Sequence, residues 1–240
     1  MEQTEPHYRA SIFQTDARFR YLDSLITVFV VVLLISNVVG QKITAIGPLR
    51  VSGAQMLFPI TYIFGDVFTE VYGYSASRKA IWFGFFASLL LSLVSLVCVA
   101  LPPAPEWPNQ RAFQTVFYTV PRLVIASLIA YWCGEFANSY TMAKMKLITK
   151  GKLLWTRTIG STVVGQAVDS VVVMFVAFYG TLPVGTIFRL IVSGYLAKVI
   201  YEMLMTPATY AVVNFLKRKE KVDYFDYDTD FNPFATTKAS

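Results

Sequence analysis

The chain has 240 residues, of which 55% are hydrophobic and 15% are charged, and its mean hydropathy is +0.51. This composition is typical of an integral membrane protein and excludes an ordinary soluble domain. The net charge is +6, but the basic residues flank apolar segments and form no stripe with stacking aromatics, so they indicate membrane topology and no nucleic-acid partner.

Apolar segments long enough to cross a bilayer recur along the chain, and they predict an all-α membrane protein with six spans. The expected spans are residues 22–42, 53–72, 81–101, 117–140, 158–179 and 187–215. The domain organisation follows from them: an N-terminal tail (1–20) with a short amphipathic helix near residues 8–19, one membrane domain (21–216), and a C-terminal tail (217–240) whose acidic and aromatic end is expected to be unstructured.

Basic residues gather in both tails and in the loops after the second and fourth spans, whereas the opposite side has few. By the positive-inside rule, both termini are expected in the cytoplasm. With three spans in each half, the halves would run in opposite orientations, which is the arrangement of an inverted repeat.

Other segments give local predictions. Residues 43–53 contain Gly47, Pro48 and Gly53 and are expected to form a short turn. The third span has only serines as polar residues, so we expect it to face lipid. Pro59 and Pro207 each remove a backbone hydrogen bond and predict bends in the second and sixth spans.

The second span has polar residues at membrane depth, where carboxylates are costly and face a protein interior or a wet cavity. On a helix, Gln55, Tyr62, Asp66 and Glu70 fall within one sector. Pro59 lies on the same segment. A polar stripe on a bent membrane helix predicts a path for a polar solute.

Three further spans contribute acids, amides or bases at the spacing of one helical face. Lys198 and Glu202 could pair within the sixth span and fix helix register, Arg122 could extend to the interface, and Glu70 and Glu135 could lie at a solvated rim. Asp66 and Asp169 are deep and have an amide or hydroxyl on the same face, so we expect both to line a polar cavity.

Such a cavity suits a guanine-like ring, because one carboxylate accepts two adjacent N–H groups. Phe58 and Tyr62 could supply stacking surfaces. The same residues would also suit a cationic drug or a proton relay.

Catalysis is not expected. The one histidine, His7, lies in the tail, so no membrane Ser–His pair forms. The cysteines Cys98 and Cys133 lack metal-ligand spacing, and no Walker A sequence is present, so we predict no metal, no cofactor and no ATP motor in this chain.

The run FPITYIFGDVFTEVYGYSASRKA (58–80) resembles the signature of the queuosine precursor transporter family, also labelled VUT, in which FP precedes D-x-x-x-E-V-Y-G and a basic pair. Further similar motifs occur in order: SN-x-x-x-x-K (36–42), R-x-x-x-A-S (122–127), W-x-R-T-x-G-S-T with Q-x-x-D-S (155–170), Y-x-x-K (195–198) and TP (206–207). The resemblance covers residues 22–216.

The resemblance implies uptake of a queuosine precursor for tRNA modification, 7-cyano-7-deazaguanine or its 7-aminomethyl form, across a bacterial-type inner membrane. An alternative is a substrate-binding subunit of an ATP-driven importer, because the size also resembles those subunits. A six-helix unit is small, so we expect a homodimer. The expected substrate-binding residues are Asn37, Gln55, Phe58, Tyr62, Asp66, Glu70, Glu135, Gln166, Asp169 and Lys198, with Lys42, Arg122 and Glu202 in a proton or ion-pair network.

Overall fold

The structure is a computed structural model that describes residues 19–39, 42–46, 49–52, 57–117, 121–180 and 183–235. The predicted amphipathic helix near residues 8–19 and the polar residue Gln55 lie outside this range. The elements in chain order are α1 (Leu22–Val39), β1 (Ile43–Ile46), β2 (Leu49–Ser52), α2 (Phe58–Tyr72), α3 (Tyr74–Ala100), α4 (Gln110–Phe117), α5 (Pro121–Ile148), α6 (Leu154–Phe178) and α7 (Val184–Glu220).

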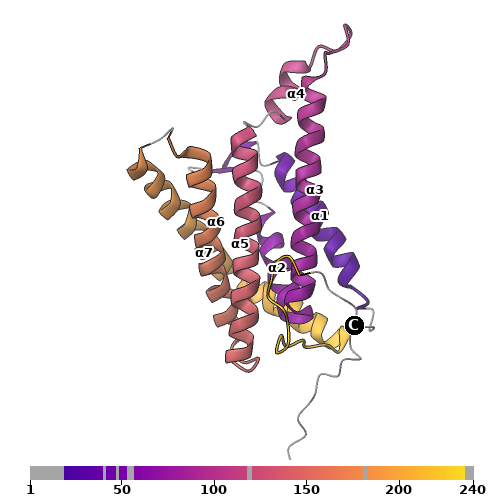
Figure 1. The fold of residues 1–240 in the computed structure, drawn as a ribbon, viewed down its shortest axis with the longest axis vertical. Coiled ribbons are helices and arrows are strands. Elements are labelled where there is room, and N and C mark those ends of the chain that lie inside the picture. Colours follow the sequence, from indigo (N-terminus) through magenta and orange to yellow (C-terminus); the bar gives the residue numbers. More distant parts are fainter. Residues whose placement is uncertain are drawn as a thin grey trace, which may run out of the picture.

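The helix α2 lies at the centre of the bundle, where it contacts α1, α3, α5 and α7. The helices α1 and α3 pack together on one side and α5 and α6 on the other, while α7 runs obliquely past α6 to the end where α2 meets α3 (Figure 1). Aromatic side chains pack around α2: Phe68 packs edge-on against Phe29 of α1 and stacks on Phe64. This core fixes the position of the polar stripe on α2.

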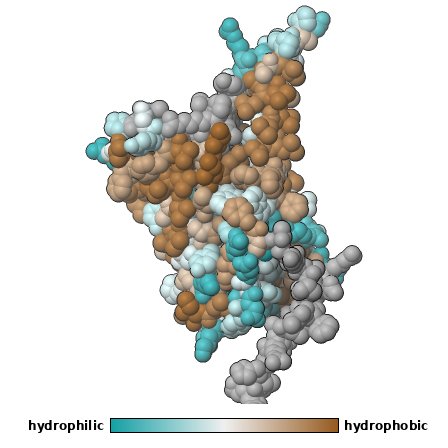
Figure 2. Space-filling view, in the orientation of Figure 1, coloured by the Kyte–Doolittle hydropathy of each residue, from teal (hydrophilic) through white to brown (hydrophobic). Residues whose placement is uncertain are grey.

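Four helices in the described part of the chain, α1, α3, α6 and α7, are long and apolar enough to cross a membrane. The other two predicted spans correspond to α2 and α5. The helix α2 has 15 residues, about 22 Å of rise, which is shorter than the hydrocarbon core. The helix α5 has 28 residues but includes Glu135, Lys144 and Lys146. An apolar band covers the visible parts of α3, α6 and α7, and hydrophilic residues gather at the lower end (Figure 2).

Two connections differ from the prediction. The expected turn at residues 43–53 contains an antiparallel β-hairpin, in which Ile43 pairs with Ser52 and Ile46 with Leu49. The proline-rich loop after the third span leads into the short helix α4, which the sequence analysis did not predict. Both connections lie at the end of the bundle opposite the α2–α3 junction (Figure 1).

The junction between α2 and α3 is a single residue, Gly73, which ends one helix and precedes the next. Its φ is +85°, in the left-handed region that favours glycine. A Cβ placed there would lie 2.2 Å from the ring of Tyr224. The short turn therefore requires glycine for two reasons, its backbone conformation and the closely packed C-terminal segment.

The C-terminal segment 221–235, here called the strap, is ordered and packs against the start of α3, contrary to the expected unstructured tail. Both carboxylate oxygens of Asp226 accept the Tyr74 backbone N–H at 3.1 Å. Arg78 donates to the carbonyls of Asp230 and Asn232. These contacts cap α3 and satisfy backbone groups that would otherwise face no partner.

Aromatic packing completes the attachment of the strap. Phe231 packs on Tyr74 with ring centroids 5.0 Å apart, and Phe234 packs against Trp82 and Trp132 at 5.8 and 5.5 Å. The acidic and aromatic composition of the strap does not predict this role, because its partners lie about 150 residues away in the chain.

Replacing Asp226 with Ala is expected to lower the free energy of unfolding by about 1 kcal/mol, the usual contribution of a helix cap. Burial raises the pKa of Asp226, and hydrogen bonds from Thr229 and the Tyr74 N–H partly offset this rise. Because burying the charge has a cost, the net stabilisation that is lost on replacement with Ala stays small. Thermal unfolding in detergent measures it. The exposed Asp228 is the matched control, and an equal shift in Asp228→Ala would contradict a specific cap.

Candidate functional site

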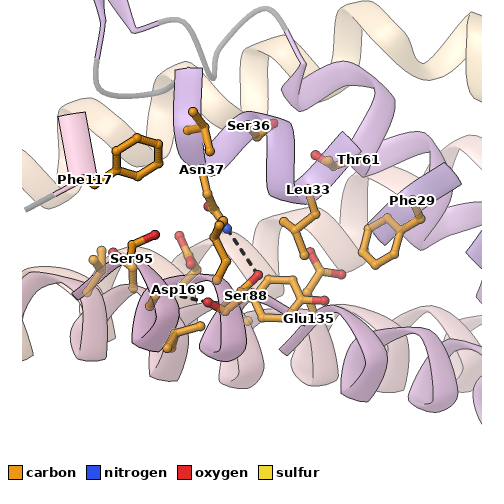
Figure 3. Close-up of a pocket in the computed structure, with 18 of the residues that line it drawn as sticks. Phe29, Leu33, Ser36, Asn37, Thr61, Ser88, Ser95, Phe117, Glu135 and Asp169 are labelled. Carbon is orange, nitrogen blue, oxygen red and sulfur yellow. Dashed lines mark hydrogen bonds between the residues drawn. The ribbon is translucent and has the colours of Figure 1, made fainter. Parts of the chain in front are cut away.

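A cavity of about 440 Å³ lies between the helices, on the side of α2 away from the strap. This volume is within the range of small-molecule sites. Its lining comes from α1, α2, α3, α4, α5, α6 and α7. Figure 3 shows Asn37 and Ser36 on one side of the cavity, Glu135 and Asp169 on another, and Phe29, Leu33 and Phe117 among the lining residues.

Five residues that the sequence analysis proposed for substrate binding line this cavity together: Asn37, Glu135, Gln166, Asp169 and Lys198. They come from four helices, and residues as distant as Asn37 and Lys198 share one space. The Asn37 amide donates to the Ser88 hydroxyl at 3.2 Å, which joins α1 to α3 at the cavity wall (Figure 3).

The two carboxylates of the cavity differ in their partners. Asp169 forms an ion pair with Lys198, with Nζ 2.5 Å from Oδ2. The expected pair of Lys198 with Glu202 is not observed, because Lys198 points across to α6. Within the described residues, Glu135 forms neither an ion pair nor a hydrogen bond, so its carboxylate is available to a ligand in the cavity.

Glu135 was expected either at a solvated rim or at the site, and the structure places it at the cavity beside α2. A Cβ added to Gly65 would lie 3.4 Å from Glu135 Oε2. The carboxylate of Glu135 therefore lies close to α2 at Gly65.

Two glycines bring α5 and α6 close together beneath the cavity. A Cβ at Gly134 would lie 2.8 Å from Cβ of Asp169, and a Cβ at Gly165 would lie 2.7 Å from Cβ of Asn138. Small residues at facing positions let helix backbones approach in membranes. This contact positions Asp169 and the neighbouring Glu135 relative to each other.

Substitution of Gly134 with Val is expected to lower the free energy of unfolding by about 1–3 kcal/mol, because the side chain must displace the α6 backbone or Asp169. The matched control is Gly194→Val on α7, since a Cβ at Gly194 meets nothing within 4 Å. Thermal unfolding of the two variants in detergent checks the difference. Equal stability would contradict a tight α5–α6 contact.

Asp66 does not line the large cavity. It lies beside a small hollow of about 10 Å³, the size of one water molecule, lined also by Gly65, Gly134, Glu135, Asn138, Thr162 and Gln166. Gly134, Glu135 and Gln166 border both spaces, so the hollow adjoins the large cavity. Asp169 therefore lines the large cavity as expected, whereas Asp66 lies beside the small hollow that adjoins it.

Glu70, one helical turn from Asp66, lies elsewhere. It is fully buried in an ion-pair cluster at the strap end of the bundle. Arg157 donates to both of its oxygens, at 3.1 and 2.6 Å, and Lys217 approaches Oε1 at 2.6 Å. Lys146 lies 3.8 Å away and also bonds Asp223. The structure thus places Glu70 in a structural cluster away from the cavity, neither at a solvated rim nor with the other proposed ligands.

Asp223 of the strap is part of this cluster. Burial alone would raise the pKa of Asp223, but hydrogen bonds from Lys146 and Lys217, with their positive charges, lower it below its ordinary value. Lys146 also donates to the backbone carbonyls of Glu70 and Tyr224. The cluster therefore ties the ends of α2, α5, α6 and α7 to the strap.

The remaining proposed site residues are placed as follows. Phe58, Tyr62 and Arg122 lie in α2 and α5, but their side chains are outside the described part, and Gln55 is outside it entirely. Lys42 is exposed just before β1 and is not among the cavity residues. Glu202 is buried on α7, next to Asp66.

The contribution of α3 to the cavity differs from the prediction. Its serines Ser88, Ser92 and Ser95 line the cavity, although the span was expected to face lipid. The opposite face of α3 is exposed through Phe86, Leu90 and similar residues. Three- and four-residue spacing of the serines was the available signal, since it places them on one face.

Three aromatic residues, Phe29, Phe117 and Tyr131, also line the cavity. Their rings supply apolar surface for a planar ligand. The cavity also holds a carboxylate–ammonium pair, two amides, several hydroxyls and Glu135, a carboxylate without a partner among the described residues, so it offers both hydrogen-bond donors and acceptors.

One family of proteins and two individual relatives, all described as transporters, are similar to this chain. Residues 52–212 match the sequence model of the family described as "Putative vitamin uptake transporter". A Bacillus subtilis protein named "Probable queuosine precursor transporter" is 30% identical over 167 residues, covering 69% of this chain and 73% of the relative. A Haemophilus influenzae protein of the same name is 23% identical over 143 residues, 58% of each chain.

No solved structure matches the chain. The family match covers most of α2 to α7, including every helix that lines the cavity except α1. The family description names a transporter, and the long apolar helices are consistent with a multi-pass membrane protein. This chain therefore belongs to the queuosine precursor transporter family, also labelled VUT.

Proposed function

We propose that this protein imports a queuosine precursor, 7-cyano-7-deazaguanine, for tRNA modification. The observation that carries the proposal is the Glu135 carboxylate, which has no partner among the described residues and lies in a cavity of ligand size, within a chain of this family. A deazaguanine ring presents adjacent N–H donors on one edge, and a single carboxylate accepts both. The names of the two relatives support the same substrate class.

In this proposal each cavity group has a distinct part. Glu135 accepts the N–H edge, and the Gln166 and Asn37 amides bond the remaining polar atoms of the ring. Phe29 and Tyr131 provide apolar surface on which the ring packs. The Asp169–Lys198 pair supplies a donor and an acceptor at the α6–α7 side.

The proposed topology has six membrane passages with both termini in the cytoplasm of a bacterial-type inner membrane. The starts of α1, α3 and α6 and the ends of α2, α5 and α7 meet at one end of the bundle. That end carries most of the basic residues, among them Arg78, Lys146 and Arg157. We also propose that two copies assemble as a homodimer.

The test is uptake of labelled 7-cyano-7-deazaguanine by cells that cannot make it, followed by transport in liposomes that contain the purified chain alone. Uptake in both is expected. Uptake in cells that vanishes in liposomes until an ATPase partner is added would favour the binding-subunit alternative. Failure in both would contradict import of this base. Parallel assays with the 7-aminomethyl form identify which precursor is preferred.

A further inference from the structure

Two buried acids from different helices lie together behind the substrate cavity. Asp66 of α2 and Glu202 of α7 each have 1% of their surface exposed. Their side chains lie within hydrogen-bonding reach of each other. Among the described residues, no donor reaches Asp66 Oδ2 or either carboxylate oxygen of Glu202. The Asn138 side chain lies beside Asp66 at the small hollow.

The charged groups around the pair do not neutralise it. Those acting on Asp66 are Glu202 of α7, Glu70 of α2 and Glu135 of α5, all of them acids. The cations near Glu70 are bound by Glu70 and Asp223, and Lys198 is bound by Asp169. Two carboxylates in contact at low dielectric cannot both remain ionised, because their repulsion adds to the cost of burial. One added proton turns the pair into a hydrogen bond.

A route connects this pair to the cavity. The water-sized hollow between them is lined by Asp66, Asn138 and Gln166, and each of these side chains has one buried oxygen without a partner in the described part of the chain. A water molecule there has enough polar partners to be stable. Glu135, the residue proposed to bind the substrate, borders both the hollow and the cavity. The hollow therefore connects Glu135 with Asp66 of the acid pair.

From this arrangement we propose that Asp66 and Glu202 form a proton-binding site that couples substrate import to the proton gradient. The inference rests on the proposed function and adds the coupling ion to it. One proton enters from the outside, is held between the two carboxyl groups, and leaves to the cytoplasm. The pair joins α2 to α7 while protonated, and loss of the proton leaves two repelling carboxylates that separate these helices.

The experiment uses purified protein in liposomes loaded with unlabelled 7-cyano-7-deazaguanine, with the membrane potential clamped at zero. Exchange of labelled for unlabelled base at equal pH reports transport without coupling. In empty liposomes, an outside pH one unit more acidic drives accumulation, which reports coupling. For one proton per substrate we expect about tenfold accumulation, since one pH unit is a tenfold proton gradient.

The Glu202→Gln variant is expected to retain measurable exchange and to lose accumulation, because the Gln amide donates to Asp66 and mimics the pair with its proton permanently bound. Infrared spectroscopy of the purified protein should show a protonated-carboxyl C=O stretch in the wild type that is missing in Glu202→Gln. The matched control is Glu106→Gln in the exposed loop before α4, which should behave as the wild type.

Several outcomes would overturn the inference. They are exchange by the wild type without accumulation, accumulation driven by a sodium gradient instead, full accumulation by Glu202→Gln, or no difference between the infrared spectra of these two proteins. Absence of exchange by the wild type would instead contradict the proposed function, while the infrared comparison still tests the proton site. Should Glu202→Gln fail to fold, the wild-type gradient experiments decide.

Discussion

Replacement of Glu135 with Gln is expected to lower uptake of labelled 7-cyano-7-deazaguanine by about 10- to 100-fold. A hydrogen bond to a charged group contributes roughly 1.5–3 kcal/mol, which corresponds to this range. The Gln side chain keeps the volume of Glu but replaces one acceptor oxygen with a donor NH₂. Since the base presents two donors on that edge, one of them would then face another donor.

The same substitution is not expected to disrupt the fold, because Glu135 forms no ion pair within the described residues and borders the cavity. Uptake per folded molecule, with folded protein counted by size-exclusion chromatography, separates binding from stability. Glu106→Gln, an identical change at an exposed position, is the control. Wild-type uptake by Glu135→Gln would remove this carboxylate from substrate recognition.

Glu70→Gln should have the largest effect on stability of any single change in the described bundle, a loss of about 3–5 kcal/mol. The carboxylate lies between Arg157, Lys217 and Lys146, and both Arg157 and Lys146 are fully buried. Without the Glu70 charge, Lys146 and Lys217 keep Asp223 as an acidic partner, whereas Arg157 keeps none among the described residues. Most of the loss therefore arises from uncompensated charge.

Thermal unfolding and the yield of folded protein measure this effect. The control is Asp23→Asn, which removes a surface ion pair with Lys79 whose side chains are 85% and 49% exposed. Exposed pairs contribute about 0–1 kcal/mol, so this variant should unfold close to the wild type. If Glu70→Gln folded normally and instead lost only substrate affinity, the structural role assigned to Glu70 would be wrong.

Carboxylates that look alike in sequence have different partners in the structure. Asp66 and Glu70 are one turn apart on α2 and belong to the same motif, yet one faces Glu202 and the other faces Arg157. Helical periodicity assigns both to one face but does not specify which neighbouring helix meets each turn. A difference of one turn, about 5.4 Å, moves a side chain from the acid pair to the cation cluster.

The sequence by itself determined the helical membrane character, the approximate helix positions and the residue types at the site. Apolar length and periodic polar residues are local properties, so they can be found without knowledge of contacts. Helical spacing pointed to Glu135, Gln166, Asp169 and Lys198, the family resemblance added Asn37, and all five line one cavity.

Only the tertiary structure decided how charges pair and which surfaces are covered. Lys198 bonds Asp169 on another helix instead of Glu202 on its own, and the serines of α3 line the cavity instead of facing lipid. The C-terminal strap became ordered through contacts about 150 residues away. Pairing energy depends on distance in space and on burial, and neither quantity is specified by spacing along the chain.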